Sequence, residues 1–135
     1  MDAPITADSF LAFLAYFGTG IGVLVAAVVV VAWTTPHHEF RLIRAGNSSA
    51  ALAFAGSLVG IALPLDAAIS HSVSLLDALI WGAASALIQI VAYLAMRWVS
   101  PKLSQQITDN IPAAGIFAAG VSIAVGLINA AAMTP

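Results

Sequence analysis

The stretch of residues 9–33 reads SFLAFLAYFGTGIGVLVAAVVVVAW and contains no charged residue. A helix of about 20 apolar residues is long enough to cross the hydrocarbon core of a bilayer, so this stretch predicts a transmembrane helix. The apolar run is too long for a secretory signal peptide, and Asp2 and Asp8 precede it where such a peptide carries positive residues. We therefore expect the stretch to remain in the protein as its first membrane span.

Three similar apolar stretches follow, at residues 49–70, 75–98 and 113–133. Of all 135 residues, 61% are hydrophobic and 7% are charged, whereas an ordinary soluble domain carries about a quarter charged residues. Ser74 and Asp77 have the spacing of a capping box, which predicts a tight hairpin between the second and third stretches. The sequence therefore predicts an all-α polytopic membrane protein with four transmembrane helices and no water-soluble domain.

The basic residues indicate the orientation in the membrane. All four flank two connections, at residues 34–48 and 99–112, and they are Arg41, Arg44, Arg97 and Lys102. Because Lys and Arg are retained on the cytoplasmic side of short loops, these two connections should be cytoplasmic. Both termini and the short connection at residues 71–74 should then lie outside the cytoplasm.

The chain also repeats itself weakly. An ordered set of three residues occurs twice, 65 residues apart, as Trp33, Thr35 and Pro36 and as Trp98, Ser100 and Pro101. Between the second and fourth stretches the corresponding spacing is 66 residues. We interpret residues 9–70 and 75–133 as two copies of a two-helix unit. An even number of helices in each copy keeps both in one orientation, related by an axis along the membrane normal.

Small residues recur on one face of several predicted helices. The second and fourth stretches carry matching sets, namely Ser49, Ala53, Gly56 and Gly60, and Gly115, Ala119, Ser122 and Gly126. Gly18 and Gly22 have the same close-packing spacing in the first stretch, and Ala27 is expected to face lipid. Because no hydrophobic force brings helices together in hydrocarbon, small residues that let backbones approach supply the packing. The contacts could lie inside one chain or between copies in a homo-oligomer.

Polar residues inside the apolar stretches form the candidate site, because each is unfavourable in hydrocarbon unless it faces protein or water. Gln89 lies near the middle of the third stretch, and Asn129 continues the small face of the fourth. Asp66 follows Pro64, which lacks a backbone donor and should kink or break the second helix. One interpretation is a pathway in which a freed carbonyl and the carboxylate bind a cation or relay a proton. The other is that the amides tie helices together and Asp66 is solvated at the membrane surface.

Other classes of function find little support. Cysteine is absent, which excludes disulfides and thiolate metal sites, and the few charges form no basic patch for nucleic acid. His37, His38 and Glu39 are adjacent, so their side chains diverge on any regular element, and no third ligand is evident. We expect no metal site there. No nucleophile motif occurs, and we expect neither an enzyme nor a bound cofactor.

Four runs of sequence carry a resemblance to a known family. They are TPHHEFRLIRAGN at residues 35–47, AALAFAGSLVGIALPL at 50–65, SLLDALIWG at 74–82 and AVGLINAA at 124–131. Together they resemble the bacterial inner-membrane family called domain of unknown function three-fifty, over nearly the whole chain. The motif positions are Glu39, Gly46, Asn47, Gly56, Pro64, Asp77, Trp81, Gln89 and Asn129. The resemblance implies a duplicated two-helix unit in the bacterial plasma membrane, and it implies no established activity. In that membrane the orientation expected from the basic residues puts both termini in the periplasm.

Two hypotheses of function follow. The first is a homo-oligomeric pathway for ions or small solutes, since four helices of this size leave little room for a passage within one copy. The second is a non-catalytic membrane scaffold whose loop recruits a cytoplasmic protein through residues that include Glu39, Arg41, Arg44, Gly46 and Asn47. The resemblance adds an envelope-stress accessory role to the second hypothesis, because family members often resemble neighbours of envelope-stress genes.

Overall fold

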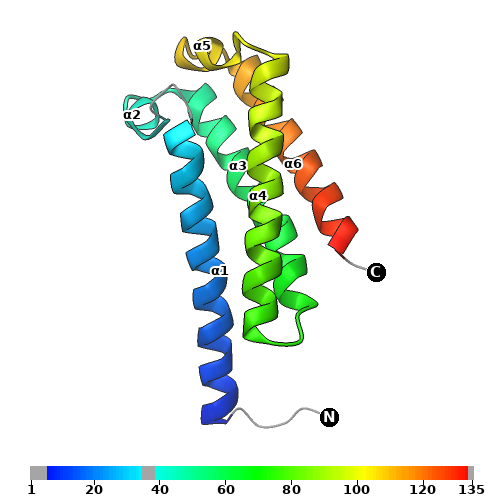
Figure 1. The fold of residues 1–135 in the computed structure, drawn as a ribbon. Helices are drawn as coiled ribbons and strands as arrows, with labels where there is room; N and C mark the ends of the chain where they lie inside the picture. Colours follow the sequence, from blue (N-terminus) through cyan, green and yellow to red (C-terminus); the bar gives the residue numbers. More distant parts are fainter. Residues whose placement is uncertain (1–5, 35–38, 134–135) are drawn as a thin grey trace.

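The computed structural model describes residues 6–34 and 39–133, and these residues form helices and short connections without a strand. The described residues form four long helices and two short ones, whose arrangement is drawn in Figure 1. The long helices are α1 (Ala7–Thr34), α3 (Ser48–Ser70), α4 (Leu75–Val99) and α6 (Pro112–Met133), and the short ones are α2 (Glu39–Arg44) and α5 (Leu103–Thr108). All four long helices are apolar enough and long enough to span a membrane. The predicted all-α fold with four transmembrane helices is confirmed.

The central contact of the bundle is between α3 and α6, which pack together more extensively than any other pair of described helices. α4 lies against both of them, and α1 lies at the edge of the bundle against α4 and α3 (Figure 1). α2 and α5 lie at one end of the bundle, and the first residues of α1 and the last residues of α6 lie toward the other (Figure 1). The bundle is therefore built on the second and fourth membrane spans.

The contact between α3 and α6 is made by backbone against backbone. A Cβ atom placed on Gly60 would lie 2.5 Å from the carbonyl oxygen of Ser122, and one placed on Gly126 would overlap the carbonyl of Gly60. Gly56 meets Ala119 in the same way, and Gly115 meets Ser49. Close approach of this kind supplies the packing that hydrophobic burial cannot supply in hydrocarbon. Residues 60 and 126 are 66 apart, the spacing at which the sequence repeats.

α1 packs through residues other than the predicted ones. Gly18 and Gly22 are exposed, and no other part of the described chain lies within 4 Å of a Cβ atom placed on either. Gly20 is buried instead, 2.9 Å from Ile69 by the same measure, and Ala27 is only 3% exposed. The expectation that Ala27 faces lipid was wrong. Because α1 is apolar on all sides, its sequence has no polar face from which the buried face can be read.

The hairpin between α3 and α4 has the predicted cap. The Ser74 side chain accepts a hydrogen bond from the backbone N–H of Asp77 at 3.1 Å, and Asp77 Oδ2 accepts from the N–H of Val73 at 3.0 Å. The bond to Ser74 satisfies a backbone donor that the first turn of a helix leaves unpaired, and the bond to Asp77 fixes the residue before the cap. The sequence predicted a kink or a break at Pro64. A break does not occur, because α3 continues through this residue, which is buried.

Candidate functional site in the polar interior

Gln89 lies near the middle of α4 and is only 5% exposed. Its Nε2 donates a hydrogen bond of 2.8 Å to the backbone carbonyl of Ser122 on α6. Gly60 makes this possible, because a Cβ atom at that position would lie 2.8 Å from the Gln89 nitrogen. Because Gly60 has no side chain, the backbone of α6 at Ser122 and the amide of Gln89 on α4 can both lie against α3 at this position.

Asn129 makes the reverse connection, from α6 to α4. It is 6% exposed, and its Nδ2 donates to the backbone carbonyl of Ser85 at 3.0 Å. The Ser85 hydroxyl donates to the carbonyl of Gly82 at 2.8 Å. Hydrogen bonds between membrane helices contribute on average about 0.6 kcal/mol each to stability. The two amides thus join α4 and α6 at two levels.

The nitrogen of the Gln89 amide has a hydrogen-bond partner, whereas its oxygen has none among the described residues. Among the described residues, Gln89 Oε1 is the only buried side-chain nitrogen or oxygen that lacks a hydrogen-bond partner. A buried acceptor without a donor costs about 1–3 kcal/mol. In a native structure such an atom needs an explanation.

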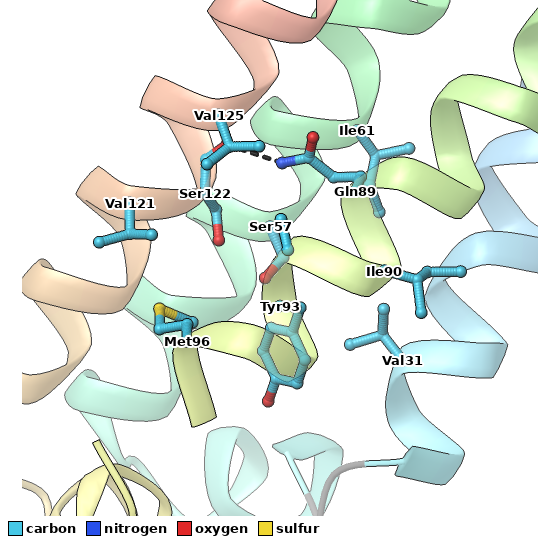
Figure 2. A pocket seen from close by; sticks show the side chains of 11 residues that line it. Val31, Ser57, Ile61, Gln89, Ile90, Tyr93, Met96, Val121, Ser122 and Val125 are labelled. Carbon is cyan, nitrogen blue, oxygen red and sulfur yellow. Dashed lines mark hydrogen bonds between the residues drawn. The ribbon is translucent and has the colours of Figure 1, made fainter. Parts of the chain in front are cut away.

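A small cavity lies beside Gln89 between α3, α4 and α6, with Val31 of α1 at one wall (Figure 2). Most of its walls are apolar, and hydroxyl-bearing side chains contribute the rest of the polar lining, namely Ser57, Tyr93 and Ser122. The centre of a water-sized sphere can occupy a volume of about 20 Å³ inside the cavity. A water molecule needs roughly 10–15 Å³ by this measure, so the cavity has room for about one.

Asp66 is not part of this buried group. It is exposed on the outward side of α3, and its carboxylate accepts one long hydrogen bond of 3.4 Å from the Ser70 hydroxyl. Exposed apolar residues precede it along the same side of the helix, at Leu52, Ala55, Val59 and Ala62. Four residues separate Asp66 from the end of α3, which is about 6 Å of helix. The structure therefore brings Gln89 and Asn129 to one helix interface and leaves Asp66 outside it.

The predicted loop residues divide into structural and exposed ones. Asn47 is buried, caps α3 by accepting from the N–H of Ala50 at 2.9 Å, and donates to the carbonyls of Ile107 at 2.9 Å and Thr108 at 3.2 Å. Gly46 has φ of 89°, which favours glycine. Arg41 and Arg44 are exposed on α2. Within the described residues no cluster of three metal-ligating side chains occurs, and His37 and His38 lie outside that part.

Sequence reasoning missed Asn110. Its side chain accepts a hydrogen bond of 3.1 Å from the backbone N–H of Ser49, and Ser49 Oγ donates to the carbonyl of Ile111 at 2.7 Å. Asn110 has φ of 58°, a conformation in which Asn is enriched among residues other than glycine. The sequence did offer a signal for a turn here, because Asn110 stands directly before Ile111 and Pro112 at the start of the fourth apolar stretch. Together with Asn47, it ties the connection before α3 to the connection before α6.

The glycine-mediated crossing of α3 and α6 and the buried amides of Gln89 and Asn129 define a polytopic membrane protein with polar side chains inside its helix bundle. The chain belongs to the family described as Domain of Unknown Function (DUF350), whose model matches residues 5–133. It is 39% identical over 127 residues to the UPF0719 inner membrane protein YjfL of Escherichia coli strain K12, covering 94% of this chain and 96% of that one. It is 27% identical over 119 residues to the UPF0719 transmembrane protein YshE of Bacillus subtilis strain 168, covering 87% and 89%. No solved structure matches the chain significantly.

Proposed function

We propose that this protein is the subunit of a homo-oligomeric pathway for ions or small solutes in the bacterial inner membrane. The name of the Escherichia coli relative supports that membrane. The basic residues support cytoplasmic connections at residues 34–48 and 99–112, and therefore two periplasmic termini. We further propose that residues 9–70 and 75–133 are parallel copies of one unit, which accords with the meeting of Gly60 and Gly126.

The pathway would run between subunits. Within one described chain, the cavity beside Gln89 has room for about one water molecule, and the backbones of α3 and α6 touch on one side of it. Gln89 and Asn129 use their amide nitrogens in bonds between helices. A continuous hydrated path through a single copy has little support from this arrangement.

The observation that carries the proposal is the outward carboxylate of Asp66 on a membrane-spanning helix. A carboxylate at the centre of a bilayer costs about 2.5–3.5 kcal/mol, but Asp66 lies near the end of α3, where the cost is lower. In a ring of subunits that turn this side of α3 inward, the Asp66 residues would form a ring of carboxylates at the outer mouth. Such rings select cations, and the apolar positions at Val59 and Ala62 would form a narrow constriction below it.

The exposed glycines of α1 are suited to contacts between subunits. Gly18 and Gly22 present a small-residue face to the outside, and Gly22 also lines an open apolar groove between α1 and α4. Thr19, Ala26 and Ala83 line the same groove. Small residues of this kind let a helix of another copy approach closely. We assign no reaction to the protein and no cofactor.

Reconstitution of the full chain in liposomes tests the pathway. We expect the wild-type protein to conduct small cations, and Asp66→Asn to reduce cation flux and the preference for cations over anions severalfold. Asp8→Asn is the matched control, because Asp8 is also an exposed carboxylate, in the first turn of α1, and its substitution should leave the flux unchanged. Native mass spectrometry of the same preparation should show several copies in one particle. Equal flux in Asp66→Asn and the wild type would remove the carboxylate from the pathway.

The scaffold is the second candidate, and the firmly tied connections favour it. Asn47 and Ser49 hold the connection after α5 in place, while Arg41, Arg44 and Lys102 are exposed at that end of the bundle. A rigid basic surface is suited to an acidic region of a cytoplasmic protein. Wild-type protein that conducts nothing across a range of ions, pH values and voltages would contradict the pathway and leave the scaffold as the function.

A further inference from the structure

A second pocket lies at the end of α4, the membrane-spanning helix that leads into α5 (Figure 1). It has a volume of about 290 Å³ and is partly open to the surroundings. α4 lines it with Leu94, Arg97 and Trp98, and the turn and α5 line it with Ser100, Pro101 and Ser104. The three residues of α4 are spaced three and four apart, so they share one face of the helix.

We propose that this pocket binds the headgroup of an anionic phospholipid from the surrounding leaflet, with the lipid phosphate held by Arg97 and by the hydroxyl of Ser100. The proposal does not depend on the pathway between subunits, because the lining residues belong to one chain. It also leaves out Arg41 and Arg44, which belong to the basic surface of the second candidate function.

The position of the pocket along α4 favours a lipid over a soluble ligand. Leu94 lies within the span and Ser100 follows its end, and six residues correspond to about 9 Å of helix. The wall of the pocket thus changes from apolar to polar where the hydrocarbon core ends and the headgroups begin. Trp98 is 86% exposed there, as is typical of aromatic residues at a membrane surface. A phospholipid has the same change of character along its length.

The side chains of the pocket suit a phosphate. Arg97 is half-buried, and none of the described residues that line the pocket is acidic. A guanidinium has five N–H donors in a planar fork that fits two phosphate oxygens, so Arg97 can hold a phosphate and still keep a bond within the protein. Ser100 adds a hydroxyl, which can donate one further hydrogen bond.

The positive charge of this region favours an anionic headgroup over a zwitterionic one. Arg97 lines the pocket, and the exposed Lys102 directly follows Pro101 at its rim. A lipid such as phosphatidylglycerol brings only a negative charge to these two cations, whereas phosphatidylcholine also brings an ammonium group, which they repel. Basic pockets at the ends of membrane helices bind anionic headgroups for this reason.

Native mass spectrometry of the full chain, titrated in detergent with defined lipids, tests the site. We expect the wild type to bind one phosphatidylglycerol per chain severalfold more tightly than phosphatidylcholine with the same acyl chains. Arg97→Gln should weaken the binding of phosphatidylglycerol severalfold and remove this preference. Arg44→Gln is the matched control, because it removes the same charge from an exposed position on α2, at the same end of the bundle, and should change the binding little.

A second variant keeps the charge of the protein. Ser100→Ala removes one hydroxyl, while the backbone N–H of residue 100 can keep its bond of 3.0 Å to the carbonyl of Met96. We therefore expect a folded protein that binds phosphatidylglycerol more weakly than the wild type does. If Arg97→Gln does not fold, this variant decides the matter, and binding as tight as in the wild type would then contradict the proposal.

Three further results would overturn the proposal. The first is wild-type protein that binds phosphatidylglycerol and phosphatidylcholine equally well. The second is an equal loss of binding in Arg97→Gln and Arg44→Gln, because a general attraction to the basic end of the bundle would then account for the lipid. The third is displacement of the lipid by an excess of inorganic phosphate, which would indicate a site for a soluble anion.

Discussion

Gly60 and Gly126 meet through their backbones where α3 crosses α6, so closely that a Cβ atom on Gly126 would overlap the Gly60 carbonyl. Neither residue has a side chain to repack, and the contact involves main-chain atoms on both helices. The crossing is therefore sensitive to a single added carbon at either position. The predictions below begin with this contact.

Substitution of a glycine at the crossing should destabilise the protein strongly. Gly126→Leu and Gly60→Leu force the two backbones apart, and we expect each to lower the stability by about 1–3 kcal/mol or to prevent folding. Gly120→Leu is the matched control, because Gly120 lies on α6 with no atom of another part of the described chain within 4 Å of a Cβ atom there. Thermal unfolding in detergent measures the difference. Equal stability of Gly126→Leu and Gly120→Leu would contradict the importance of the crossing.

Replacing Asn129 should have a small and measurable effect. Asn129→Leu removes the bond to the Ser85 carbonyl, and we expect a loss of about 1 kcal/mol, since such bonds between membrane helices are weak. Ile128→Leu, at the exposed neighbour, should change the stability much less. Equilibrium unfolding of both variants in the same detergent makes the comparison. An Asn129→Leu protein as stable as Ile128→Leu would show that this bond contributes nothing.

Asn47→Ala should loosen the end of the bundle that carries α2 and α5. The substitution removes the N-cap of α3, worth about 0.5–2 kcal/mol, and also the bonds to the carbonyls of Ile107 and Thr108. We expect faster hydrogen exchange at the first amides of α3 and in α5, with α1 unaffected. The exposed neighbour Ser48 provides the control as Ser48→Ala. Exchange that does not change in α5 would mean that Asn47 acts on α3 alone.

The orientation can be checked with reporter fusions. Because the basic residues flank the two longer connections, a reporter that is active only in the periplasm should be active when fused after Pro135 and silent when fused after Asp109. A reporter that is active only in the cytoplasm should show the reverse. If both reporters gave the opposite pattern, the proposed orientation would be wrong.

The sequence predicts the helices and the hairpin because those depend on local residues. The four spans follow from apolar length, and the cap at Ser74 and Asp77 follows from a spacing of three. The inward face of α1 could not be predicted, since Gly20 and Ala27 stand among apolar residues on all sides. α3 passes through Pro64 without a break, because a helix in a bundle has neighbours that support it at such a point.

Only part of the candidate site matches its prediction, since Gln89 and Asn129 are buried together at one helix interface while Asp66 is exposed outside it. Gln89 and Asn129 were recognisable as buried polar groups, but their partners are backbone carbonyls of Ser122 and Ser85, which carry no mark in the sequence. The bond from Asn47 to Ile107 joins residues 60 apart and depends on how the two connections come together. Only the three-dimensional packing determines which backbone groups become available.

Because α3 packs mainly on α6, the most extensive helix contact of the bundle cannot form until α6 has been synthesised. The glycine face of α3 is synthesised before its partner helix α6, which is the last of the four spans described here. Until then, lipid chains must cover that face, as they cover any independently inserted helix. Insertion and packing are consequently separate events here, and a chain truncated before α6 would have inserted spans but no crossing to fold around.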